Sequence, residues 1–339
     1  MSLTYLITGA TGFVGSHVAD ECVRRQIQVV TIARPTSNTK HLESLGATIL
    51  RGDFDHPDLL REALANASVV IHCAAKVGDW GPVEEYRAFN VDATRKLLDA
   101  CIDRGSALRR FVHLSSLGVY EARHHYGTDE TVPPPPRHID GYTQTKVESE
   151  QLVLDYHRLH GVPVTVLRPG FIYGPRDRTV LPTLVRALQE RQVRYLGDGS
   201  AALNTTYVGN LVAAIFLAID HPAALGQIYN ITDGEYVSKR RFFEAVADGL
   251  KLPRPRRQVP LWLARIAAKV MEGRARRRNS PTPPRLTQAR LKFLGLNLDF
   301  SIAKARTQLG YDPPFSFEQG MAETLRWYQS QQMQPVQGG

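Results

Sequence analysis

Only three cysteines, Cys22, Cys73 and Cys101, occur in the 339-residue sequence. Their number is odd, no CxxC pair occurs, and no group of histidines and cysteines has the spacing of a zinc site. These absences argue against a disulfide framework and against a bound metal. Because all three cysteines have apolar neighbours, we interpret them as small core residues of a protein in the reducing cytoplasm.

Long apolar runs are also missing. The longest apolar stretches, Leu211–Ile219 and Val259–Met271, are too short to span a bilayer. The first apolar run, Leu3 to Ile7, leads straight into a glycine loop without a preceding basic segment, so we expect no signal peptide. Apolar residues make up 43% of the chain and charged residues 22%, a composition that supports a buried core and excludes global disorder.

The formal net charge of +9 comes from one part of the chain. Residues 251–290, called the basic segment below, hold twelve lysines and arginines against a single acid, Glu272, and so carry +11. The remaining residues sum to −2. Nucleic acid is therefore the partner that the charge favours least.

Within the basic segment, Val259–Met271 has the pattern of an amphipathic helix with cations on one side. Three interpretations stay open. The helix caps an apolar substrate, lies on an anionic membrane as a peripheral contact, or packs on the protein with a solvated basic face.

Short β-branched apolar runs alternate with helical patterns over the first 170 residues. Runs that are apolar throughout indicate strands covered on both faces, so the pattern predicts an α/β fold: a Rossmann-type, doubly wound parallel sheet with a smaller C-terminal substrate lobe. We expect strands at Thr4–Thr8, Gln28–Ala33, Thr48–Arg51, Val69–Cys73, Arg110–Leu114 and Val164–Arg168, and helices at Gly12–Arg25, Pro57–Asn66, Glu84–Arg104 and Tyr142–His160.

The expected domains follow from the change of pattern after Arg168. Residues 1–168 form the dinucleotide-binding domain, to which elements from about 205–235 return, including a strand at Gln227–Ile231. Residues 169–330 form mainly the substrate lobe, and 331–339 a flexible tail.

The first strand runs into a glycine loop, and a helix follows. Glycines there allow a tight turn and let backbone N–H groups approach a pyrophosphate, while the helix amino terminus adds a positive dipole end. Because the loop lies between the first strand and first helix of a βαβ unit, it has the context of a dinucleotide site. The residues expected at the pyrophosphate are Gly9, Thr11, Gly12, Phe13, Val14 and Gly15.

The end of the second strand selects between the two nicotinamide cofactors. A carboxylate there would bind the ribose 2′-hydroxyl, whereas this sequence has Ala33 and Arg34. The arginine matches a 2′-phosphate, so NADP(H) is favoured and NAD(H) is the alternative. Asp53 and Phe54 close the third strand. Asp53 is a candidate partner of the adenine amino group and equally a candidate helix N-cap.

Tyr142 and Lys146 are four residues apart and so share one helix face. An adjacent ammonium favours the phenolate, so we expect Lys146 to lower the pKa of Tyr142 toward the range of a general acid or base, and to hold the nicotinamide ribose. Ser115 and Ser116 follow the preceding strand, where a hydroxyl can polarise a substrate carbonyl; turn formation is the alternative.

These stretches together resemble the extended short-chain dehydrogenases/reductases. The matches are Thr8–Gly15, Gly52–Asp53, Val70–Ala75, Asn90, Leu114–Tyr120, Tyr142–Lys146, Leu167–Asp177 and Leu309–Pro313. The resemblance implies Ser116, Tyr142 and Lys146 as catalytic residues, with Asn90 steadying the active-site backbone. It implies further cofactor contacts at Ala74, Ala75, Lys76, Asn90, Pro169 and Phe171. Many members carry a polar residue, often asparagine in those that handle sugars, where this chain has Phe171.

Residues 74–81 are similar to the 3β-hydroxysteroid dehydrogenase branch of that family, which includes sterol-4-carboxylate 3-dehydrogenases and 2-alkyl-3-oxoalkanoate reductases. The branch implies substrate contacts at Lys76, Trp80, Ser116 and Tyr207. The family commonly forms homodimers through helices that correspond to residues 84–104 and 142–160.

Three functions follow as hypotheses. The first is an NAD(P)-dependent oxidoreductase that interconverts a 3-hydroxy and a 3-oxo group on a hydrophobic substrate. The second is an NDP-sugar epimerase or dehydratase, in which Arg176, Arg178 and the basic segment would hold a diphosphate. The third is a non-catalytic cofactor sensor or nucleic-acid binder, which the intact Ser116, Tyr142 and Lys146 argue against.

Overall fold

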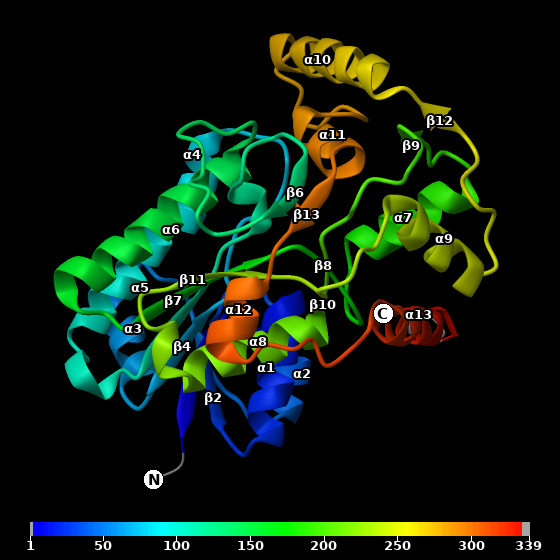
Figure 1. Ribbon diagram of the computed structural model, residues 1–339. Coiled ribbons are helices and arrows are strands. Elements are labelled where there is room, and N and C mark those ends of the chain that lie inside the picture. The colour runs from blue at the N-terminus through cyan, green and yellow to red at the C-terminus, as the bar shows by residue number, and fades with distance from the viewer. Residues whose placement is uncertain (1–2, 334–339) are drawn as a thin grey trace.

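The computed structural model describes residues 3–333. Its main body is a seven-stranded sheet in which every paired strand is parallel, in the order β11-β7-β5-β4-β1-β2-β3 (Figure 1). The predicted doubly wound α/β fold is confirmed. The strands are β1 (Thr4–Thr8), β2 (Gln28–Ala33), β3 (Thr48–Arg51), β4 (Val69–His72), β5 (Arg110–Leu114), β7 (Val164–Pro169) and β11 (Ile228–Ile231).

Helices cover both faces of this sheet, because its central strands are apolar on both sides. The first core cluster buries α1 (Phe13–Arg24), α8 (Val208–Asp220) and α12 (Ala303–Leu309) on one face. The second cluster buries α3 (Pro57–Leu64), α5 (Ala93–Ile102) and α6 (Gly141–His160) on the other. Of the three cysteines predicted as core residues, Cys22 and Cys101 are buried in these two clusters, and Cys73 is partly buried against the first.

The helix predicted over Glu84–Arg104 consists of three pieces. It begins as α4 (Val83–Arg87), passes through a π-helical turn at Ala88–Asp92 and continues as α5. The π-helical turn contains Asn90, which is 2% exposed. A short helix α2 (Lys40–Ser44) was not predicted from the sequence.

A smaller lobe lies beside the carboxyl ends of the strands. Its core combines α7 (Val180–Gln189), α9 (Lys239–Gly249) and α13 (Phe317–Met333) with the strand pairs β8–β10 and β9–β12. The strands are β8 (Phe171–Tyr173), β9 (Tyr195–Leu196), β10 (Thr205–Tyr207) and β12 (Gln258–Val259). Three residues of the predicted tail belong to α13, and residues 334–339 lie outside the described part.

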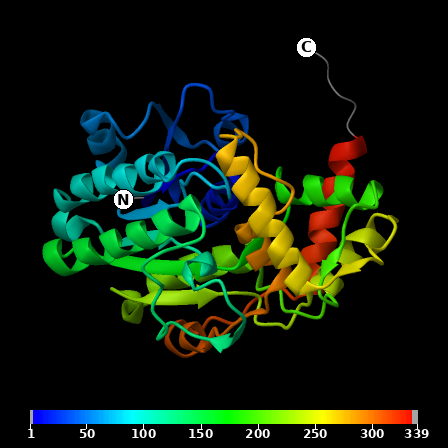
Figure 2. The same cartoon turned by 90° about the horizontal axis from the view of Figure 1, so that it is seen from above.

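The basic segment forms an outer layer. Figure 2, seen from above, shows α10 (Leu261–Arg277) nearest the viewer, crossing between the sheet and the smaller lobe. Beneath it lie α11 (Gln288–Gly295) and β13 (Leu298–Phe300), which pairs with β6 (His125–Thr128) (Figure 1). Among residues 3–333, no helix is both long enough and apolar enough to cross a membrane.

Candidate active site

The glycine loop lies between β1 and α1, at the point where the strand order reverses. A Cβ on Gly9 would lie 2.8 Å from the amide nitrogen of Ala74, and one on Gly15 would lie 2.3 Å from the carbonyl oxygen of Gly9. Only glycine fits both places. Gly12 is the N-cap of α1, and no side chain caps the helix, so its first N–H groups face outward. This cradle fits a dinucleotide pyrophosphate.

Two arginines meet at the ends of β2 and β3. Arg34 is exposed beside the buried Ala33, as a side chain reaching for a 2′-phosphate needs to be. Arg51, which sequence reasoning missed, donates from β3 to the carbonyl oxygen of Ser37 at 3.1 Å and to the hydroxyl of Thr39. Arg51 therefore fixes the loop that follows Arg34.

Asp53 and Phe54 follow β3. The carboxylate of Asp53 accepts from the amide of Asp55 at 3.0 Å, and α3 has His56, not Asp53, at its N-cap. Of the two roles suggested for Asp53, the helix N-cap is thus wrong. The ring of Phe54 lies against His72, with 6.3 Å between centroids.

The three catalytic candidates meet at the carboxyl end of β5. Ser116 caps the 3₁₀ turn Leu117–Val119, and its Oγ accepts from the amide of Gly118 at 3.0 Å. Tyr142 stands in the first turn of α6, which Asp140 caps by accepting from the amide of Thr143 at 2.8 Å. Lys146 is 5% exposed, and its Nζ donates to the carbonyl oxygen of Leu114, one residue from the serines, at 2.7 Å.

The pKa of Tyr142 differs from the sequence prediction. Desolvation raises the pKa of its phenol to about 12; a hydrogen bond with Ser116 opposes this rise, and the charge of Asp140 adds to it. The expectation that Lys146 lowers this pKa is wrong for this structure, in which desolvation dominates the shift and the Lys146 ammonium donates to the carbonyl oxygen of Leu114. Burial in turn lowers the pKa of Lys146 to about 8. Tyr142 is accordingly a protonated donor at neutral pH.

Asn90 holds the loop that follows β4. Its side-chain oxygen accepts from the amide of Lys76 at 2.7 Å, and its side-chain nitrogen donates to the carbonyl oxygen of Lys76 at 3.1 Å and to the hydroxyl of Thr145 at 3.0 Å. Asn90 thereby ties Lys76, which follows Ala74 and Ala75 in this loop, to the helix of Tyr142. The ammonium of Lys76 pairs with Glu85 and lies 5.3 Å from the ring centroid of Tyr86.

Phe171 forms part of an apolar wall just after the carboxyl end of β7, beyond the buried Pro169. Its ring lies 4.9 Å from that of Phe293 and 5.4 Å from that of Phe242, measured between centroids. Phe293 also packs against the cluster that contains Leu117, next to Ser116. The wall therefore connects the smaller lobe to the turn that holds Ser116.

Trp80 and Tyr207, two of the suggested substrate contacts, have structural partners. The indole of Trp80 donates to the carbonyl oxygen of Ser280 at 2.8 Å, so it joins the loop after β4 to the basic segment. Tyr207 is 3% exposed, and its hydroxyl donates to Glu323 on α13. Its ring packs on Tyr173 and Phe315. These contacts give Tyr207 a place in the lobe core.

Lys292 is a residue of this region that sequence reasoning missed. It projects from α11, is 8% exposed, and donates to the carbonyl oxygens of Gly118 and Tyr120 at 2.8 and 2.5 Å. Burial lowers its pKa to about 8, against the raising effect of Asp140 and Glu121. A lysine on a short helix 150 residues after Tyr142 gives no local signal of this contact.

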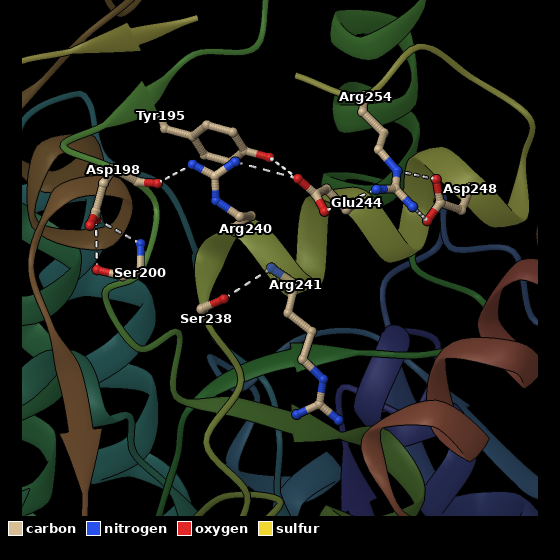
Figure 3. Close-up of polar contacts among 9 residues, drawn as sticks. All are labelled: Tyr195, Asp198, Ser200, Ser238, Arg240, Arg241, Glu244, Asp248 and Arg254. Atoms are coloured by element: carbon tan, nitrogen blue, oxygen red, sulfur yellow. Dashed lines mark hydrogen bonds and ion pairs between the residues drawn. The ribbon is translucent and has the colours of Figure 1, made fainter. Parts of the chain in front are cut away.

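Another cluster of charges lies away from these residues, in a surface hollow of about 510 Å³ between α9 and α13. None of the residues predicted for the site lines it. Its two cations have structural partners: Figure 3 shows Arg240 stacked on Tyr195 with 4.6 Å to the ring centroid, and Arg241 pairs with Glu235 at 3.3 Å and with Glu318. Asp248, which also lines the hollow, pairs with Arg254 at 2.6 Å. Structural pairing accounts for these charges.

Comparison with known proteins adds a family match. The protein-family model described as "NAD dependent epimerase/dehydratase family" matches residues 5–232 of the sequence. The chain is 33% identical over 344 residues to a 3 beta-hydroxysteroid dehydrogenase/Delta 5-->4-isomerase of Mycobacterium tuberculosis, covering 96% of this chain and 90% of that protein. It is 29% identical over 316 residues to a 4-hydroxy-2-methyl-3-oxo-4-farnesyl-3,4-dihydroquinoline-1-oxide ketoreductase of Stigmatella aurantiaca, covering 93% of each.

Among solved structures, the chain is similar to a UDP-glucuronic acid 4-epimerase from Bacillus cereus in complex with UDP-glucuronic acid and NAD. The TM-score is 0.76 at 24% identity, covering 97% of this chain and all of that chain. At this identity the likeness establishes a shared fold.

Proposed function

The chain belongs to the NAD dependent epimerase/dehydratase family, and from that premise we propose that it interconverts a 3-hydroxy and a 3-oxo group on a hydrophobic substrate. The substrate classes that fit are steroids or sterols and 2-alkyl-3-oxo acids. The relatives above carry the names of a dehydrogenase and a ketoreductase, and the chain is an oxidoreductase of this family.

The observation that carries the proposal is the apolar wall of Phe171 and Phe293 beside the turn of Ser116. A substrate oxygen near Ser116 and Tyr142 would place the rest of the molecule against aromatic rings. A sugar hydroxyl buried against those rings would lose its hydrogen bonds to water without replacement, which costs free energy. An alkyl or steroid ring gains from the same contact.

The chemistry divides among three side chains. A nicotinamide held at the glycine loop would supply the hydride transfer, to the carbonyl carbon in reduction and from the carbinol carbon in oxidation. Tyr142 donates its phenolic proton to the oxygen in reduction and accepts a proton from it in oxidation. The amide of Gly118 occupies one lone pair of Ser116 Oγ, which leaves the Ser116 proton for Tyr142 in the unliganded protein and for the substrate oxygen when substrate is bound.

Lys146 orients this arrangement. Its ammonium has three N–H donors, and one of them is held by Leu114. The others are available to the nicotinamide ribose and to the oxygen of Tyr142. An ammonium drawn toward Tyr142 would favour the phenolate that oxidation requires.

We propose NADP(H) as the cofactor within this NAD-dependent family. The support is Arg34, exposed at the end of β2 where an NAD-specific carboxylate would stand. Arg51 holds the adjoining loop and adds a second positive charge. An arginine fork fits a phosphate better than it fits a ribose hydroxyl.

An NDP-sugar epimerase or dehydratase is the alternative within the family, and the contacts of Arg176 weigh against it. Its guanidinium pairs with Asp20 at 2.5 Å and lies 3.0 Å from the ring nitrogen of His41. These contacts direct Arg176 away from the role of a diphosphate ligand.

The test is the oxidation of NADPH and of NADH with steroid ketones, 2-alkyl-3-oxo acids and UDP-sugars. We expect turnover of an apolar ketone with NADPH. Tyr142→Phe should abolish that turnover while cofactor binding survives, and Tyr126→Phe, at a tyrosine that is 76% exposed on β6, should change neither. Tightly held NAD with no net NADPH consumption on any ketone would instead support the epimerase.

A homodimer through α5 and α6 stays a prediction from the family resemblance. Sedimentation of the purified protein would test it.

A further inference from the structure

The outward face of α10 is apolar. Four large side chains form an apolar stripe along it: Trp262 (65% exposed), Ile266 (53%), Val270 (46%) and Leu263 (44%). Trp262, Ile266 and Val270 follow one another at intervals of four residues, so they line one side of the helix, and Leu263 lies beside them. Large apolar side chains gathered at this exposure mark a contact surface.

The stripe is not needed to hold α10 on the protein. The opposite face carries Ala264 and Ala268, which are 1% and 0% exposed and form a small cluster with Leu291 of α11. These alanines are displaced by about half a turn from Ile266 and Val270 on the helix. In Figures 1 and 2, α10 is the outermost helix of this side of the molecule.

Cations flank the stripe on both sides. Helical geometry places Arg265 and Lys269 along one edge of the stripe and Arg274 along the other. Of the twelve cations of the basic segment, only Arg254, Arg276 and Arg290 have an ion-pair partner within residues 3–333. The positive field around the stripe is therefore largely uncompensated.

We propose that α10 docks this protein flat on an anionic lipid bilayer, with Trp262, Ile266, Val270 and Leu263 in the headgroup–acyl boundary and the flanking cations on the lipid phosphates. An apolar stripe flanked by cations on a helix is the pattern of in-plane membrane binding. The 17-residue α10 spans about 25 Å, so it contacts several headgroups at once.

Charge complementarity selects lipid over the other occupants. A nucleic acid would neutralise Arg265 and Lys269 but has no hydrocarbon to cover the stripe. A second copy pairing through the same face would bring the like charges of two basic segments together. An anionic bilayer provides both the hydrocarbon and the negative charge.

The docked orientation also has a functional result. α11 lies directly beneath α10 and holds Lys292 on the turn of Ser116. Docking through α10 thus turns the side of the molecule with the candidate active site toward the bilayer, where apolar substrates dissolve. The docking itself does not depend on the proposed substrate.

The experiment is flotation of the full chain with two kinds of vesicle, one of phosphatidylcholine alone and one with added phosphatidylglycerol. We expect binding to the anionic vesicles, weakened by salt, with a blue shift of Trp262 emission that Trp262→Phe removes. The double variant Ile266→Glu, Val270→Glu should lose at least about tenfold in partitioning. The double variant Arg265→Gln, Lys269→Gln should lose a factor of roughly 30.

The control is Leu225→Glu, which places one glutamate at a leucine that is 46% exposed outside the basic segment, next to the turn Pro222–Ala224. It should bind vesicles as the wild type does, and all variants should keep their circular dichroism spectrum. Equal partitioning of wild type and the Ile266, Val270 variant would overturn the proposal. An absence of binding to anionic vesicles would also overturn it. In that case, binding of duplex RNA would indicate a nucleic-acid surface, and a dimer that becomes a monomer in the Ile266, Val270 variant would indicate a contact between two copies.

Discussion

The ammonium nitrogen of Lys292 lies 2.8 Å from the carbonyl oxygen of Gly118, whose amide in turn donates to Ser116. A side chain from the outer layer of the protein therefore holds the turn that orients the serine proton. Lys292 acts through Ser116 and is a positioning residue. Its removal should loosen the geometry at the substrate oxygen and leave the glycine loop unchanged.

We predict that Lys292→Met lowers kcat for ketone reduction by about 10- to 100-fold, the effect of a small misplacement of a catalytic group. The Kd for NADPH should stay within about twofold, since the loop of Gly9 is formed by other elements. Steady-state kinetics measures kcat, and fluorescence titration measures the Kd for NADPH. Lys292→Arg should restore part of kcat. Equal loss of cofactor binding would indicate general unfolding instead.

We predict that Arg34→Ala weakens NADPH binding by about 10- to 100-fold, as expected for the loss of charge-assisted hydrogen bonds to a phosphate. NADH, which lacks that phosphate, should bind as before. Titration of both nucleotides to the variant and the wild type tests this. The control is Arg61→Ala, which removes an exposed arginine of α3 that pairs with Asp58. An equal effect on the two nucleotides would contradict a 2′-phosphate role.

The lowered pKa of Lys146, about 8, predicts a pH dependence. The ammonium is present below that pH and is lost as the pH rises through it, so kcat/KM for reduction should fall above about pH 8. This profile reports the free enzyme. In Lys146→Arg the charge persists to a far higher pH, and the variant's residual activity should show no fall in this range. A fall that persists in the arginine variant would assign it to another group.

The buried pair Arg168–Glu150 predicts a large stability effect. Both side chains are at most 5% exposed, and Arg168 also donates to the hydroxyl of Tyr120 at 2.8 Å. Glu150→Ala leaves the guanidinium buried without a counter-charge, so the free energy of unfolding should drop by about 3–5 kcal/mol. Urea unfolding measures the loss. Asp58→Ala breaks an exposed pair with Arg61 and should cost no more than about 1 kcal/mol.

The sheet could be predicted from the sequence because its strands are covered on both faces and their apolar runs are continuous. β1, β2, β3 and β5 match the predicted bounds, and β4 and β7 differ by one residue at their ends. Strand order then places the loop of Gly9, the turn of Ser116 and the start of α6 at one edge. The local motifs of the site follow from this topology.

Contacts between residues far apart in the sequence could not be predicted. Tyr142 and Lys146 share a helix face as expected, but the carbonyl oxygen of Leu114, from another element, takes up the ammonium and leaves desolvation to raise the pKa of the phenol. The hydroxyl of Tyr207 meets Glu323, more than a hundred residues later in the chain. The amphipathic pattern at Val259–Met271 did predict α10. The pattern alone does not distinguish a helix that contacts substrate from one that contacts a bilayer or one whose basic face is solvated.

Asp79 binds Arg290 at 2.7 Å and accepts from the hydroxyl of Thr287 at 2.8 Å, while the neighbouring Trp80 donates to Ser280. These three links connect the loop after β4 to the basic segment across one side of the candidate site. A molecule that leaves between them must first break several hydrogen bonds at once. We predict that escape of the product limits turnover, so that kcat falls with solvent viscosity while the chemical step itself stays fast.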